Sequence, residues 1–67
     1  MLNSQAQQNT DRYNAKDAEY MKALYESPRD EQKCLRLARE LAEMSKGTAL
    51  EDRNKTRVER HQRRINA

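Results

Sequence analysis

Four arginines near the C-terminal end of the sequence are spaced so that they could hold phosphate groups together. Arg53, Arg57, Arg60 and Arg64 follow one another at intervals of four, three and four residues. In an α-helix, at about 100° per residue, their guanidinium groups share one stripe about 60° wide. A guanidinium group donates two parallel hydrogen bonds to a phosphate or a carboxylate. The spacing therefore predicts an anion-binding surface on a C-terminal helix.

The charges around this stripe are not balanced. Glu59 is the only acidic residue after Asp52, and on the helical wheel it lies away from the arginines. Like charges at these intervals destabilise an isolated helix by about 0.2–0.5 kcal/mol per pair. A purely structural helix more often interleaves its charges, as the segment 36–43 does. The contrast favours a binding surface, although basic residues at a helix C-terminus are also favoured by the helix dipole.

Nucleic acid is the first candidate ligand of this segment. Asn54, Thr56 and Gln62 could add contacts to bases or sugars, and the pattern does not separate RNA from DNA. Alanine in place of Arg57 or Arg60 is expected to weaken binding and leave the fold intact. The residues assigned to nucleic-acid contact are Arg53, Lys55, Arg57, Arg60, Arg63 and Arg64.

The stretch NKTRVERHQRR, residues 54–64, is similar to the arginine-rich RNA-binding peptides of phage antiterminators. The likeness lies in the T-R and E-R pairs and in the arginines that follow them. It covers 11 of 67 residues. In those antiterminators the motif stands near the N-terminus, whereas here it is C-terminal. The resemblance implies a small RNA-binding regulator of a phage or a mobile element.

A protein partner is the alternative. The segment 28–46 carries apolar residues over about half of its helical circumference, which is typical of a half-buried helix. Another chain could dock on Leu37, Leu41 and Met44, with Tyr25 at the edge of the contact. The protein would then be an interaction module, such as an inhibitor, an assembly factor or a minor virion component. The arginine stripe could equally bind an acidic protein surface.

The sequence offers few residues for catalysis or for binding a metal or a cofactor. Cys34 is the only cysteine, so no internal disulfide is expected, and it falls on the apolar face as a small core residue. His61 is the only histidine, which leaves a Cys/His metal site without ligands. The single glycine excludes a phosphate-binding loop of the P-loop type. We expect a non-enzymatic protein with no cofactor.

Two stretches divide the chain into helices. In ESPRDE, Ser27 is the predicted N-cap and Pro28 the first helical residue. In KGTALE, Gly47 suits the left-handed step that ends a helix, and Thr48 with Glu51 forms a capping box for the next helix. The predicted helices span about residues 10–26, 28–46 and 49–65, and residues 1–8 are expected to be frayed.

These boundaries predict an all-α fold in one domain, residues 1–67. An antiparallel helical hairpin would be joined by a third, basic helix. On the first helix, Tyr13, Tyr20 and Leu24 line up as a core face, but Asp17 interrupts it. The third helix would dock through a thin apolar seam made of Leu50, Val58, His61 and Ile65.

Composition limits the stability of the chain and indicates its cellular location. Only 34% of the residues are hydrophobic, and the net charge is +3. A core this small is marginal in a short chain, so we expect a homo-oligomer, such as a dimer, or folding with a partner. The sequence lacks the apolar stretch of a membrane span and the pattern of a signal peptide. With its unpaired thiol, these features favour a cytoplasmic location.

Overall fold

A computed structural model describes the backbone of residues 2–67 and the side chains of residues 10–67. It contains three helices: α1 (Leu2–Leu24), α2 (Glu31–Met44) and α3 (Glu51–Asn66). The described residues form no strand, so the all-α prediction is confirmed. Helix α1 begins well before the predicted position near residue 10 and includes residues 2–8, for which fraying was predicted.

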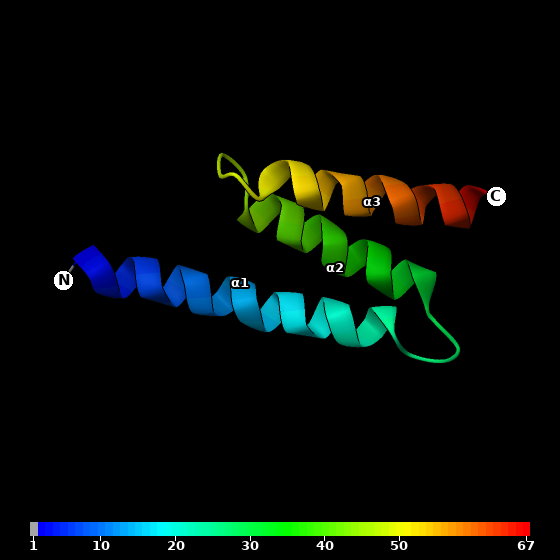
Figure 1. Ribbon diagram of the computed structural model, residues 1–67, viewed down its shortest axis with the longest axis horizontal. Helices are drawn as coiled ribbons and strands as arrows, with labels where there is room; N and C mark the ends of the chain where they lie inside the picture. Colours follow the sequence, from blue (N-terminus) through cyan, green and yellow to red (C-terminus); the bar gives the residue numbers. More distant parts are fainter. Residues whose placement is uncertain (1) are drawn as a thin grey trace.

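Successive helices run in opposite directions, so α1 and α3 point the same way (Figure 1). Helix α2 lies between the other two and packs against both. The molecule measures 47 × 23 × 13 Å, and the N-terminal part of α1 extends beyond the other helices (Figure 1). The loop after α1 and the C-terminal end of α3 lie at the same end of the molecule.

The core is small and centred on α2. Its buried face, which consists of Cys34, Leu37, Ala38 and Leu41, packs against Tyr20 and Ala23 of α1. Val58 of α3 packs against the same cluster and is partly buried. Since both outer helices cover this face of α2, it is the interior of the chain's own fold.

The start of α2 differs from the prediction. The N-cap is Asp30, whose carboxylate accepts a hydrogen bond from the backbone N–H of Lys33 at 3.1 Å. Asp caps a helix as well as Ser does, and here it supplants Ser27. The Nε atom of Arg29 donates to the carbonyl oxygen of Leu24 at 2.8 Å and closes the end of α1. Residues 25–30 are therefore a connecting loop, and α1 ends at Leu24 rather than near residue 26.

The turn between α2 and α3 confirms one prediction and corrects another. Gly47 has a φ of 82°, the left-handed conformation predicted for it. The predicted capping box does not form, because Leu50 is the N-cap of α3 and Thr48 lies further back. The Thr48 hydroxyl accepts from the N–H of Leu50 at 3.2 Å, and the Glu51 carboxylate accepts from the N–H of Gly47 at 3.2 Å. Glu51 thus reaches back across the turn instead of capping its own helix.

Candidate functional site

The inward face of α3 is polar. Asn54, Arg57 and His61 are exposed by only 0%, 9% and 0% of their surface. The predicted apolar seam is confirmed only in part: His61 is fully buried, Val58 packs against the core and Ile65 is partly buried, whereas Leu50 is 37% exposed. The side chains that dock α3 carry hydrogen-bonding groups, which a search for apolar periodicity does not detect.

These three side chains pair with polar side chains of α1 that also follow a helical spacing. The members of each pair are 40 or 41 residues apart, so α1 and α3 lie parallel in one fixed register. We call this set of contacts the polar ladder. Its three pairs are Tyr13–Asn54 (3.1 Å), Asp17–Arg57 (2.7 Å) and Tyr20–His61 (2.7 Å).

Asn54 links all three helices at one end of the ladder. Its amide nitrogen lies 3.1 Å from the hydroxyl of Tyr13, 2.9 Å from that of Ser45 and 3.4 Å from the carbonyl oxygen of Leu41. Its carbonyl oxygen accepts a hydrogen bond from Arg57 at 3.2 Å. Both halves of the amide are thus engaged inside the fold, and Asn54 is not available to a base or a sugar.

Arg57 forms the middle pair of the polar ladder, so it is not part of the exposed arginine stripe. Its Nη1 atom donates to the Asp17 carboxylate at 2.7 Å, and its guanidinium carbon lies 4.5 Å from the centre of the Tyr20 ring. This contact explains why Asp17 interrupts the apolar face of α1. The structure corrects the prediction that Arg57 presents its charge to a ligand, because the guanidinium group is buried between helices.

His61 connects the ladder to the start of α2. Its Nε2 atom lies 2.7 Å from the Tyr20 hydroxyl, and its Nδ1 atom lies 2.6 Å from the Glu31 carboxylate. The same carboxylate lies 3.2 Å from Arg29 and 3.5 Å from Arg64. The hydrogen bond from His61, helped by Arg29, lowers the pKa of Glu31 below its ordinary value. Both ring nitrogens are engaged and the ring is fully buried, so this group positions helices.

The other predicted cations of α3 remain on the surface, and not all are equivalent. Lys55 pairs with Glu51 at 3.3 Å and lies about 160° from Arg53 on the helical wheel. It therefore faces away from the stripe. Among residues 10–67, Arg53, Arg60 and Arg63 are exposed and have no carboxylate within ion-pair distance.

Arg64 is intermediate, since its side chain is 46% exposed and its contact with Glu31 is long. Together these exposed arginines define the basic face of α3: Arg53, Arg60, Arg63 and Arg64.

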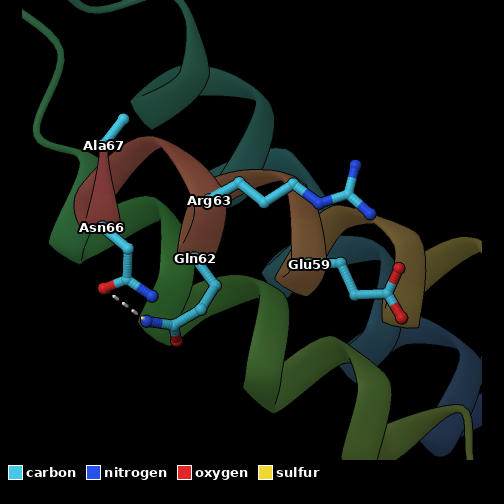
Figure 2. A pocket seen from close by; sticks show the side chains of 5 residues that line it. All are labelled: Glu59, Gln62, Arg63, Asn66 and Ala67. Carbon is cyan, nitrogen blue, oxygen red and sulfur yellow. Dashed lines mark hydrogen bonds between the residues drawn. The ribbon is translucent and has the colours of Figure 1, made fainter.

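The surface beside Arg63 is shallow and open. Figure 2 shows Arg63 and Glu59 extending along one side of α3, away from the hydrogen bond between Gln62 and Asn66 (3.4 Å). Gln62 also accepts a hydrogen bond from Arg39 of α2 at 3.0 Å. Of the polar side chains predicted to assist binding, only Thr56 is exposed on α3 and free of other helices.

The residues predicted to meet a protein partner fall into two groups. Leu37 and Leu41 are exposed by 1% and 0%, because α1 and α3 cover them, so the structure corrects their assignment to an external surface. Tyr25 and Met44 are exposed by 76% and 41%. Met44 lines a shallow pocket together with Leu50 and Tyr13, between the end of α2 and the middle of α1.

Within the described residues, no three His, Cys, Asp or Glu side chains are placed to hold a metal ion. No helix in that same part of the chain combines the length and the apolar character needed to cross a membrane. No known family model, curated protein or solved structure matches this chain.

Proposed function

We propose that this protein is a non-enzymatic factor that binds the phosphates of a nucleic acid with the basic face of α3. One observation carries the proposal: four exposed arginines, Arg53, Arg60, Arg63 and Arg64, gather on this one helix, and of these four only Arg64 has a carboxylate within ion-pair distance. Several cations elsewhere on the described surface do have carboxylate partners: Lys16–Glu40 (3.0 Å), Lys33–Glu26 (3.5 Å), Arg29–Glu31 (3.2 Å) and Lys55–Glu51 (3.3 Å).

The spacing of the face suits a chain of phosphates. Arg53 and Arg60 are two helical turns apart, about 10.5 Å at 1.5 Å per residue, and Arg64 stands one turn further on. Each guanidinium group can bind a phosphate through two parallel hydrogen bonds. Arg64 can exchange its long contact with Glu31 for a phosphate, while Arg29 still pairs with that carboxylate and His61 still holds a hydrogen bond to it.

A salt titration tests the proposal. With three or four phosphates neutralised, the logarithm of the affinity for duplex DNA should fall with that of salt concentration with a slope of about −3. The measurement is fluorescence anisotropy of labelled RNA and DNA. Arg60→Ala should weaken binding and flatten the slope by about one.

Lys55→Ala is the matched control, because it removes one charge from the same helix but from its opposite side. It should leave the affinity nearly unchanged. Absence of binding to every RNA and DNA probe at low salt would refute the proposal, as would equal losses from the two variants.

A protein-interaction module is the second candidate, favoured by the exposure of Met44 and Leu50 side by side. In this reading the chain is a helical hairpin with a basic third helix that pairs with another copy or another protein through that patch. Light scattering would show a dimer, and Met44→Gln would return it to a monomer. A monomeric wild-type chain that is unaffected by Met44→Gln would count against self-association.

A further inference from the structure

Tyr25 is the most exposed of the large apolar side chains in the described part of the chain, at 76%. Its backbone is nevertheless well held. The Tyr25 N–H donates to the carbonyl oxygens of Met21 and Lys22 at 3.3 and 3.2 Å, so the chain still follows the path of α1. Arg29 bonds the neighbouring carbonyl of Leu24 at 2.8 Å. The Tyr25 ring is therefore exposed to solvent, whereas its backbone is held by hydrogen bonds.

The polar ladder fixes the height of Tyr25 relative to the basic face. Its pairs are 40 or 41 residues apart, and the same offset relates Tyr25 to residues 65–66 in the C-terminal turn of α3. Arg64 belongs to the same turn of α3. Figure 1 shows the end of α1 and the C-terminus of α3 pointing toward the same end of the molecule, with α3 extending beyond the end of α1.

Tyr25 and the arginines also share one side of the molecule. Tyr25 directly follows α1, and because its N–H still bonds the carbonyl of Met21 it continues the helical wheel, about 80° beyond Asp17 and away from the residues that face α2. On α3, Arg60 and Arg64 lie beside buried Arg57, again on the side turned away from α2. Asp17 and Arg57 form an ion pair between α1 and α3. Tyr25, at the end of α1, and the arginines of α3 therefore lie on either side of the polar ladder, on the same face of the molecule.

We propose that Tyr25 stacks on an unpaired base of a single-stranded nucleic acid whose phosphates lie on the basic face of α3. An exposed aromatic ring beside phosphate-binding arginines is the usual combination for holding a single strand. In a duplex the bases are already stacked on one another, so the ring has no free base to contact. This inference rests on the proposed function and adds that the ligand is single-stranded.

The test compares probes of the same length, about ten nucleotides, by fluorescence anisotropy at low salt. Single-stranded RNA and DNA should bind more tightly than the matched duplexes. Tyr25→Ala should weaken single-strand binding about 5- to 100-fold, the usual range for loss of one stacked base. Tyr25→Phe and Tyr25→Trp should retain it, because both keep a ring. The duplex affinity should change less than twofold.

An abasic strand provides the sharpest control. It keeps the phosphates but offers no base, so Tyr25→Ala should have no effect on its binding, whereas Arg60→Ala should still weaken it. Circular dichroism should show that Tyr25→Ala leaves the thermal midpoint unchanged, since the ring is exposed.

The outcomes separate this inference from the proposed function. If Arg60→Ala lowers the affinity for all probes while Tyr25→Ala changes none, the stacking role is wrong and phosphate binding stands. If Tyr25→Ala instead dissociates a dimer in light scattering and leaves every probe affinity unchanged, the ring contacts protein, which also overturns the inference. If no probe binds to the wild type, the proposed function itself fails.

Discussion

The hydroxyl oxygen of Tyr20 and the Nε2 atom of His61 lie 2.7 Å apart, and this contact joins the two outer helices across the middle one. The Glu31 carboxylate can only accept a hydrogen bond, so we assign a proton to Nδ1 of His61. Nε2 then accepts the hydrogen bond that the Tyr20 hydroxyl donates. One ring thus orders an α1 side chain, an α2 side chain and its own helix.

The first prediction concerns acid. Because the hydrogen bond from His61 lowers the pKa of Glu31, ionised Glu31 stabilises the fold above its ordinary pKa of 4.5. That stabilisation is lost as the pH falls through the lowered pKa in the folded state. Glu31→Gln should therefore flatten the loss of stability below pH 4.5, measured by urea unfolding between about pH 3 and 7. The exposed control Glu59→Gln should keep the wild-type slope. Identical profiles for the two variants would show that Glu31 has no such role.

The second prediction separates two arginines of the original stripe. Arg57→Met should lower the free energy of unfolding by about 1.5–3 kcal/mol, because Asp17 and Asn54 lose a charged donor. Arg60→Met should change it by less than about 0.5 kcal/mol, since Arg60 is an exposed surface residue. Chemical denaturation of both variants checks this. Equal stabilities would contradict the buried position of Arg57.

The third prediction tests the donor role of Asn54. Asn54→Asp keeps the side-chain volume but turns a carboxylate toward the carbonyl oxygens of Leu41 and Leu50, which lie 3.4 and 3.1 Å from the present amide nitrogen. Loss of these donors and burial of a charge should cost more than about 2 kcal/mol of stability. Asn66→Asp makes the same change on the exposed end of α3 and should be nearly neutral. A thermal midpoint that is equally insensitive to both substitutions would rule out the network around Asn54.

The fourth prediction uses Cys34 as a reporter of the core. The thiol is fully buried, and burial, together with the nearby charge of Glu31, raises its pKa. A thiol reagent at neutral pH should react with it only after unfolding, and rapidly in denaturant. Leu37→Ala should speed the reaction of the native protein, because a cavity of this kind destabilises a core by about 2–5 kcal/mol. Equal rates in the native and the denatured wild-type chain would place Cys34 on the surface.

The parts of the fold that the sequence predicts well are those indicated by apolar periodicity and by turn residues. The three helices, the left-handed Gly47 and the buried Cys34 follow from local signals that no tertiary contact overrides. The start of α2 was misplaced, since Ser27 and Asp30 are both good caps and the choice between them depends on how Arg29 folds back on Leu24.

The docking face of α3 was missed for a different reason. Apolar periodicity points to Val58 and His61, but two of the inward residues, Asn54 and Arg57, are polar and carry no apolar signal. A signal was nevertheless present. Asp17 lies inside the otherwise apolar face of α1, and a carboxylate in that position needs a cation from another helix. Matching the polar spacing of α1 against that of α3 would have pointed to Arg57.

The polar ladder also determines how much order α3 has before any ligand arrives. Arginine-rich segments without such support are disordered when free, and they lose conformational entropy when they bind. Here hydrogen bonds to Tyr13, Asp17 and Tyr20 hold α3 in place, so its exposed arginines keep fixed intervals in the unbound protein. Binding to this surface, as proposed above, therefore does not require α3 to fold at the same time.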